Sequence, residues 1–179
     1  MAKKKVNHRE HFLDKTEKAK IDRYVEICAQ FYNLHINSIA DKVLDVGASD
    51  GQLINHIKCD SYYAIDIKPA AKFVQKGTIM GIAESTFNVV VYNHVFEHLI
   101  NPSLELQQIH KVLKYQGKLI LNVPYFTAPW AWELEGHYHM YNEKNLSRLL
   151  ELHGFTTIEF FRVIFRENKE ELILIAQKC

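Results

Sequence analysis

Two short apolar segments, each ending in a turn signal, constrain the fold of this chain more than any other feature. Residues 42–46 lead into Gly47, and residues 62–66 end at Asp66, which lies 21 positions after Asp45. Such runs predict buried strands, and the apolar residues between them predict a helix. A strand, a glycine turn and a helix, with an acid about 20 residues later, are typical of nucleotide-binding α/β units.

The rest of the chain continues this alternation of strands and helices. The further predicted strands cover residues 73–79, 87–92, 118–123, 156–165 and 171–178. Helices are predicted over residues 14–37, from Asn101 to a C-terminal glycine at Gly117, and from Asn142 to Gly154. The last two strands are joined by a short polar link and must pair antiparallel, because a parallel pair needs a long crossover. We therefore expect an α/β fold with a mainly parallel sheet and one reversed strand.

Length, charge and cysteine usage limit the organisation of the chain and its partners. A length of 179 residues fits one domain, which we expect at 16–179, preceded by a flexible basic arm at 1–15. The net charge of +1 provides no general attraction to nucleic acid or anionic lipid. No apolar run reaches the ~18–20 residues of a membrane span. Three scattered cysteines imply no disulfide framework, which favours a cytoplasmic protein. The oligomeric state stays open.

The turn from Gly47 to Gly51 allows more than one interpretation. A dinucleotide fingerprint G-x-G-x-x-G fails, because Ser49 and Gln52 stand where glycines are required. The string Gly47-Ala48-Ser49-Asp50-Gly51 also matches the G-x-S-x-G nucleophile elbow of hydrolases. That interpretation needs a larger sheet and a histidine presented late in the chain. A plain tight turn in an α/β protein is the remaining alternative.

Five segments in a fixed order carry a resemblance to a known family. VLDVGASDG, YYAIDI, FNVVVYNHVFEHLINP, VLKYQGKLILNVP and GHYHMYNEKNLSRLLELHGF together resemble the class I S-adenosylmethionine-dependent methyltransferases. The match is best to the small-molecule branch that includes quinone-biosynthesis and sugar or lipid O-methyltransferases, and it covers about residues 40–179. The resemblance implies a Rossmann-like, seven-stranded, mostly parallel sheet with an antiparallel last strand and helices on both faces.

The same resemblance implies S-adenosyl-L-methionine as the cofactor and assigns residues to it. The residues implied to surround its methionine part are Asp45, Gly47, Ala48 and Gly51, with Asn93 facing the amino-acid moiety. Asp66 is implied to bind the ribose hydroxyls, and Ile67 to lie beside the adenine. The chain departs from the family pattern at Ser49 and at Gly77-Thr78, where the family often has glycine and Gly-Asp. These departures bear on adenine recognition.

The candidate catalytic residues are Glu97, His98 and His137. The family often has Glu-His close to the transferred methyl group, and a histidine with a pKa of ~6.5 suits removal of a hydroxyl proton. An alternative is that Glu97 and His98 only orient their loop. The string H-x-x-E-H at 94–98 also matches a metalloprotease pattern, but that pattern needs one helix to carry its ligands. We therefore predict no metal ion, with a site at His94, Glu97 and His98 as the alternative.

Taken together, these features predict an enzyme that methylates a small-molecule acceptor, at a hydroxyl oxygen. His137 lies in an aromatic segment, residues 125–141, that we expect to cover the acceptor pocket. One alternative is an inactive cofactor-binding module that serves in protein interactions. Another is an RNA methyltransferase, although the tetrapeptide typical of base amino-group methylation is missing where residues 93–96 read Asn-His-Val-Phe. We therefore do not expect nucleic acid as a partner.

Overall fold

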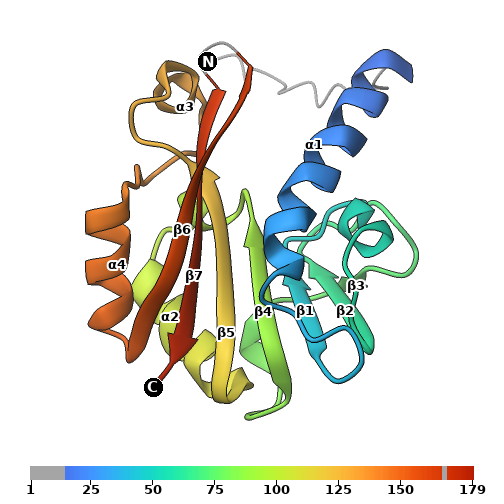
Figure 1. Ribbon diagram of the computed structural model, residues 1–179, viewed down its shortest axis with the longest axis vertical. Coiled ribbons are helices and arrows are strands. Elements are labelled where there is room, and N and C mark those ends of the chain that lie inside the picture. Colours follow the sequence, from blue (N-terminus) through green and yellow to red (C-terminus); the bar gives the residue numbers. More distant parts are fainter. Residues whose placement is uncertain (1–14, 167–168) are drawn as a thin grey trace, which may run out of the picture.

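A seven-stranded sheet forms the centre of the molecule (Figure 1). The structure is a computed structural model that describes residues 15–166 and 169–179. The strand order is β3-β2-β1-β4-β5-β7-β6. The strands are β1 (Lys42–Val46), β2 (Ser61–Asp66), β3 (Gln75–Lys76), β4 (Phe87–Asn93), β5 (Leu113–Pro124), β6 (Phe155–Arg166) and β7 (Lys169–Lys178). Within these described strands, β7 pairs antiparallel with β5 and β6, and every other pair is parallel. The predicted fold, with a reversed last strand, is confirmed.

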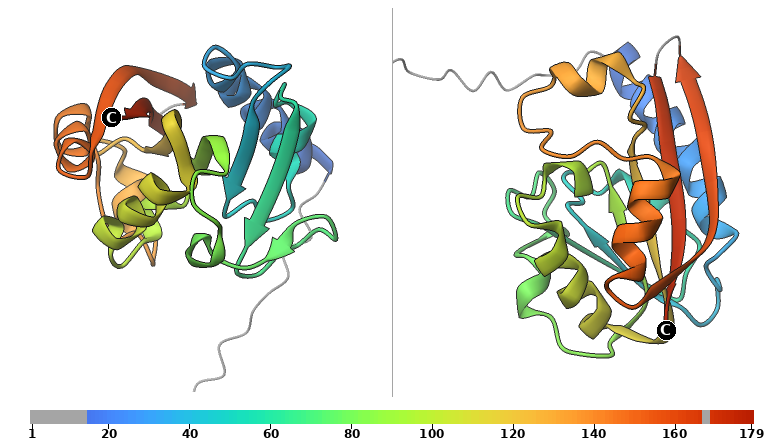
Figure 2. Two further views of the ribbon diagram at one scale, coloured as in Figure 1. Left: turned by 90° about the horizontal axis from the view of Figure 1, so that it is seen from below. Right: turned by 90° about the vertical axis from the view of Figure 1, so that its left-hand side faces the viewer.

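Helices cover both faces of the sheet (Figure 2). They are α1 (Lys15–Asn33), α2 (Pro102–Val112), α3 (Pro129–Glu133) and α4 (Glu143–Glu151), with 3-10 turns η1 (Gln52–Asn55), η2 (Ile79–Gly81) and η3 (Phe96–His98). Successive strand residues face opposite sides. Leu119 and Leu121 pack in the core beneath α2 and α4, whereas Ile120 packs in the core beneath α1. No helix within the described residues is long and apolar enough to cross a membrane.

Polar caps fix the ends of α2 and α4 as the sequence predicts. The Asn101 side chain accepts a hydrogen bond from the Leu104 backbone N–H at 3.1 Å, which satisfies a free donor of the first turn. Asn142 and Asn145 form a reciprocal capping box at the start of α4. Gly154 follows α4 with a φ of 79°, a conformation that glycine adopts without strain.

Two predicted elements are much shorter than expected. The helix expected after β1 is only the turn η1. Leu53 and Ile57 are buried but Ile54 is exposed, so the segment has too few buried apolar residues to stabilise a longer helix. The strand expected over 73–79 is reduced to Gln75 and Lys76 at the edge of the sheet, where both residues are exposed. The helix α1 ends at Asn33, a few residues before its predicted end. The arm predicted at 1–15 lies outside the described residues except for Lys15, which begins α1.

The role predicted for Gly117 is wrong. Helix α2 ends at Val112 and β5 begins at once, so Gly117 lies inside a strand instead of capping a helix. The pairing between β4 and β5 steps from Leu113 directly to Lys118, which makes residues 114–117 a bulge. A Cβ at Gly117 would lie 2.9 Å from the Lys114 carbonyl oxygen. The bulge therefore requires glycine because two backbone segments approach closely there.

Candidate active site

A cavity of about 310 Å³ lies where β1 and β4 end and α1 passes over them. Figure 1 shows the N-terminal part of α1 extending past this end of the sheet. The residues that line the cavity come from α1, the turn after β1, and the end of β4: Ile21, Tyr24, Val25, Asp45, Gly47, Ala48, Ser49, Asp50, Gln52, Leu53 and Asn93. Ligands of open α/β sheets bind outside the carboxyl ends of the strands. The predicted residues Asp45, Gly47, Ala48 and Asn93 are thus brought to one cavity.

The turn after β1 depends on its two glycines. Gly47 and Gly51 have φ values of 76° and 73°, a region that other residues enter only with strain. A Cβ at Gly47 would lie 2.3 Å from Val95 Cγ2, and one at Gly51 would lie 2.3 Å from Phe73 Cζ. Gly51 does not line the cavity. Its place is beneath the turn, where it allows the chain to pass against Phe73.

Hydrogen-bond acceptors dominate the polar wall of the cavity. Asp45 is buried, and burial raises the pKa of its carboxyl to about 7, a shift that the hydrogen bond from the Tyr62 hydroxyl opposes and the charge of Asp66 increases. The buried Oε1 of Gln52 has no hydrogen-bond partner among the described residues. A buried acceptor without a partner is costly unless a ligand supplies a donor. Asp45 and Gln52 therefore suit a positively charged or N–H-bearing group.

Asp66 supports the turn from outside the cavity. Its Oδ2 accepts the Ser49 backbone N–H at 2.8 Å, and its Oδ1 accepts the Lys68 backbone N–H at 2.6 Å. Ser49 has a φ of 51°, so this bond holds a strained residue in place. The neighbouring Ile67 is 64% exposed and open to a ligand. Neither Asp66 nor Ile67 is among the residues that line the cavity.

Asn93 belongs to a polar network that sequence reasoning missed in part. Its Oδ1 accepts the Tyr32 hydroxyl at 2.8 Å and the Asn122 amide at 2.9 Å. The Asn122 amide also donates to the Tyr24 hydroxyl at 2.8 Å. Tyr24 lies in the first predicted helix, where apolar and aromatic residues recur every three to four positions, but this periodicity alone does not show that the helix forms a cavity wall. The same holds for its neighbours Ile21 and Val25.

His94 lies between two buried carboxylates just past β4. Its Nδ1 is 3.1 Å from Glu97 Oε1, and its Nε2 is 3.1 Å from Glu171 Oε1. Burial lowers the pKa of His94, but the carboxylates of Glu171 and Glu97 outweigh burial and raise it from 6.5 to about 10. Glu171 was not a predicted site residue. The antiparallel pairing of β7 with β5 sets it opposite Pro124, at the end of β5.

The three predicted catalytic residues form a cluster after β4. Ligand atoms of Glu97, His98 and His137 lie within 4.8 Å of one another, and the rings of the two histidines are 4.6 Å apart between centroids. His98 Nδ1 is 2.9 Å from the Gly136 carbonyl oxygen and must therefore donate its proton there. The metal set considered at His94, Glu97 and His98 does not form, because both nitrogens of His94 are engaged by carboxylates.

The aromatic loop between β5 and α4 packs over this cluster. The backbone N–H groups of Tyr138 and His139 both donate to the Glu97 carbonyl oxygen, at 2.9 and 3.3 Å. The Trp130 ring centroid lies 6.4 Å from that of His94 and 6.1 Å from that of His137. The rings of Trp132 and Tyr138 in the same loop are exposed. This loop therefore carries His137 to Glu97 and His98, which are about 40 residues away in the sequence.

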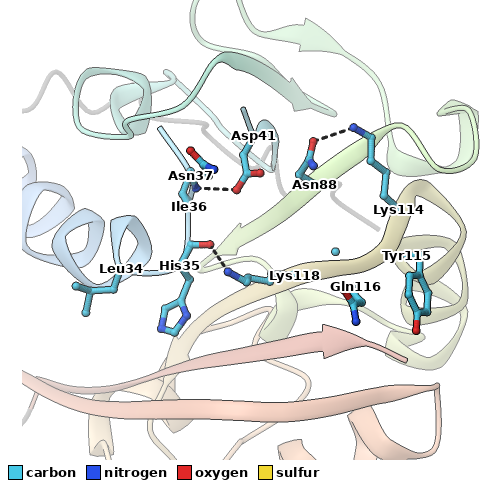
Figure 3. Close-up of a pocket in the computed structure, with 11 residues that line it drawn as sticks. Leu34, His35, Ile36, Asn37, Asp41, Asn88, Lys114, Tyr115, Gln116 and Lys118 are labelled. Atoms are coloured by element: carbon cyan, nitrogen blue, oxygen red, sulfur yellow. Dashed lines mark hydrogen bonds between the residues drawn. The ribbon is translucent and has the colours of Figure 1, made fainter. Parts of the chain in front are cut away.

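A second cavity, of about 450 Å³, lies beside the bulge of β5 (Figure 3). Lys118 Nζ donates to the His35 carbonyl oxygen at 2.8 Å, and Lys114 Nζ donates to Asn88 Oδ1 at 3.0 Å. None of the sequence-predicted site residues lines it. It lies where β4 begins and not where β4 ends, so it is separate from the cavity at Asp45 and Asn93.

Comparisons with known proteins agree with this geometry. A family described as "Methyltransferase domain" matches residues 8–159. Among solved structures, a SAM-dependent methyltransferase from Archaeoglobus fulgidus has a TM-score of 0.70 at 18% identity, covering 88% of this chain and 94% of that one. The YcgJ protein from Bacillus subtilis has a TM-score of 0.67 at 10% identity, covering 87% and 98%.

A third solved structure contains ligands. It is the 1,6-didemethyltoxoflavin-N1-methyltransferase from Burkholderia thailandensis, with bound 1,6-didemethyltoxoflavin and S-adenosylhomocysteine. It has a TM-score of 0.66 at 19% identity, covering 91% of this chain and 80% of that one. No curated protein sequence matches this chain. The family match spans most of the chain, the seven-stranded sheet is the one expected for it, and the glycine turn lines a cavity: the chain belongs to the methyltransferase domain family and is an S-adenosylmethionine-dependent methyltransferase.

Proposed function

We propose that this methyltransferase methylates a hydroxyl oxygen of a small-molecule acceptor. The observation that carries the proposal is the cluster of Glu97, His98 and His137. Glu97 and His98 of this cluster follow β4, the strand that ends at the cavity. Because His98 donates through Nδ1 to a carbonyl, its Nε2 presents a lone pair that can take a proton. A base at this point suits a hydroxyl, which must lose its proton as it becomes an ether.

The cofactor is assigned to the cavity at the end of β1 and β4. Asp45 and Gln52 would accept hydrogen bonds from the ammonium of its methionine part, and Gly47 and Ala48 would let it approach the backbone. Asn93 would contact the same part. Asp66 would accept the ribose hydroxyls with its remaining lone pairs, while the exposed Ile67 would lie against the adenine. When bound, S-adenosylmethionine supplies a methyl group on a sulfonium, which is an electrophile.

The residues of the cluster would bind the acceptor and remove its proton. His98 Nε2 would accept the proton that the acceptor hydroxyl loses as it becomes an ether. Glu97, held by His94 through Oε1, would fix the acceptor with Oε2. His137 would position the acceptor from the loop side, beside Trp130. The aromatic rings of the loop support an acceptor with an apolar body, and the Burkholderia enzyme, which binds a small heterocycle, supports a small-molecule acceptor.

The proposal also includes the bounds of the domain and the location of the protein in the cell. All seven strands belong to one sheet, which supports a single domain over residues 16–179. Three free cysteines without a disulfide framework support a cytoplasmic location.

The direct test is identification of the methylated product. The protein is incubated with methyl-labelled cofactor and fractionated small molecules from a cell extract, and the labelled compound is identified by mass spectrometry. We expect label in an O-methyl ether, and a large loss of label with His98→Gln. His153→Gln serves as the matched control, because His153 follows the end of α4, outside the cluster and the cavity, and its Nδ1 donates to the Leu149 carbonyl oxygen at 2.8 Å. Label in RNA, protein or an amine instead would refute the proposal.

A further inference from the structure

The cluster of Glu97, His98 and His137 contains polar atoms that no hydrogen bond among the described residues satisfies. Glu97 Oε2 and His137 Nδ1 are buried and have no hydrogen-bond partner among the described residues. His98 donates through Nδ1 to Gly136, which leaves Nε2 as an acceptor. A buried acceptor without a partner is costly unless a ligand supplies positive charge or a donor. A carboxylate and two imidazoles that lie this close together therefore suit a cation.

Each of the three side chains also interacts with a second group that can fix its orientation, as metal ligands in proteins usually do. Metal-binding histidines donate their other ring N–H to a carbonyl or carboxylate, which fixes the tautomer and the ring orientation. His98 does this with the Gly136 carbonyl oxygen at 2.9 Å. The backbone of Ala131 interacts with the His137 ring from the same loop. Glu97 is held through Oε1 by His94 at 3.1 Å.

The spacing of the atoms also fits a metal ion. Tetrahedral ligands at ~2.0–2.2 Å from zinc lie about 3.4 Å from one another. The atoms of the cluster all lie within 4.8 Å of one another, so small side-chain rotations bring them to this spacing. His98 is exposed, whereas Glu97 is buried on the turn after β4. Two histidines and one carboxylate are a donor set that zinc and related divalent ions prefer.

We propose that Glu97 Oε2, His98 Nε2 and His137 Nδ1 bind one divalent metal ion of the zinc class, with a fourth position open. This ligand set differs from the H-x-x-E-H string, because His137 of the aromatic loop takes the place that His94 holds in the string. The use of the ion rests on the proposed function. A hydroxyl bound in the open position would have a lowered pKa, and its proton would pass to solvent water, because His98 as a metal ligand would no longer accept it.

Metal binding is measured without any assay of activity. The full chain is stripped with a chelator, dialysed, and titrated with Zn²⁺ by calorimetry and with Co²⁺ by its visible absorption, which reports tetrahedral coordination. We expect one ion per chain. Glu97→Gln, His98→Gln and His137→Gln should each weaken binding more than tenfold, and His153→Gln should leave it unchanged. Circular dichroism identifies any variant that fails to fold. Because the His98 side chain lies at the surface, His98→Gln is the variant expected to disturb folding least.

The outcomes separate this proposal from the proposed function. Absence of a saturable Zn²⁺ or Co²⁺ signal, or equal affinity in wild type and His98→Gln, overturns the metal site. Methyl transfer measured in the presence of chelator is a second readout. Full transfer to a hydroxyl with chelator present would keep the proposed function and reject the metal role. One bound ion with no transfer to any hydroxyl would keep the site and reject the proposed function.

Discussion

The buried carboxyl of Asp45 gives a prediction in which cofactor affinity and stability change in opposite directions. Burial raises the pKa of Asp45 from 3.8 to about 7 in the folded chain. The folded state therefore binds more protons than the unfolded state between these two values, so stability falls as pH rises through this window. Above pH 7 the full cost of the ionised carboxylate is present. At 1.36 kcal/mol per pKa unit it reaches about 4 kcal/mol at most.

Asp45→Asn should therefore stabilise the protein and weaken cofactor binding. Asparagine keeps an acceptor for the Tyr62 hydroxyl but carries no charge. Above neutral pH we expect the free energy of unfolding to rise by about 2–4 kcal/mol. If the cofactor's ammonium requires ionised Asp45, wild-type affinity for S-adenosylhomocysteine should rise about tenfold between pH 6 and pH 8, as the ionised fraction rises. The variant should bind more weakly at pH 8 and show no such rise.

Urea unfolding and calorimetry at about pH 6 and pH 8 measure both effects. Asp60→Asn is the matched control, because Asp60 is an exposed carboxylate at the start of β2, where it accepts the Ser61 hydroxyl. It should change neither quantity. Equal wild-type affinity at the two pH values would refute the reasoning, as would an Asp45→Asn variant that binds as tightly as wild type at pH 8.

The remaining predictions concern the ribose, the base and the β5 bulge. Asp66→Ala should weaken S-adenosylhomocysteine binding tenfold to several hundredfold, since each hydrogen bond to a charged group contributes roughly 1.5–3 kcal/mol; an unchanged dissociation constant in calorimetry contradicts this. His98→Gln should lower kcat by ~10²–10⁴-fold with little change in cofactor affinity. Steady-state kinetics with the identified acceptor measure this, and a variant as active as the wild type would show that His98 only supports its loop. Gly117→Ala should destabilise the chain by about 1–3 kcal/mol, because its Cβ would meet the Lys114 carbonyl oxygen. Gly77→Ala should cause no such loss, because a Cβ there has no atom within 4 Å. Equal melting temperatures of the two variants would refute the account of the bulge.

Local patterns in the sequence predict most of the sheet. The central strands β1, β4 and β5 are strongly apolar because both of their faces are buried, and α2 and α4 carry their own capping residues. The polar link near residues 166–170 is enough to predict that β6 and β7 pair antiparallel. Local patterns overestimate the lengths of β3 and η1, where few residues are buried. They also misassign Gly117, because glycine is favoured both in a bulge and after the end of a helix.

Residues that the sequence assigns to one site lie together in the structure where one segment carries several of them. Asp45, Gly47 and Ala48 reach the cavity together because one turn holds all three, and Glu97 and His98 share η3. The α1 wall of the cavity and the contact of Glu171 with His94 depend on strand order and register, which no local pattern encodes. The loop that carries His137 reaches Glu97 through backbone hydrogen bonds, and these are also invisible in the sequence.

Calorimetric titration of the full chain with S-adenosylhomocysteine and, separately, with NAD tests the central claim most directly. The single glycine turn, Asp45 and Asp66 suit one nucleoside with an amino-acid tail, and the fingerprint for a pyrophosphate is missing. We expect one S-adenosylhomocysteine bound per chain, with affinity reduced by Asp66→Ala, and no heat of binding with NAD. Binding of NAD without binding of S-adenosylhomocysteine would contradict the account.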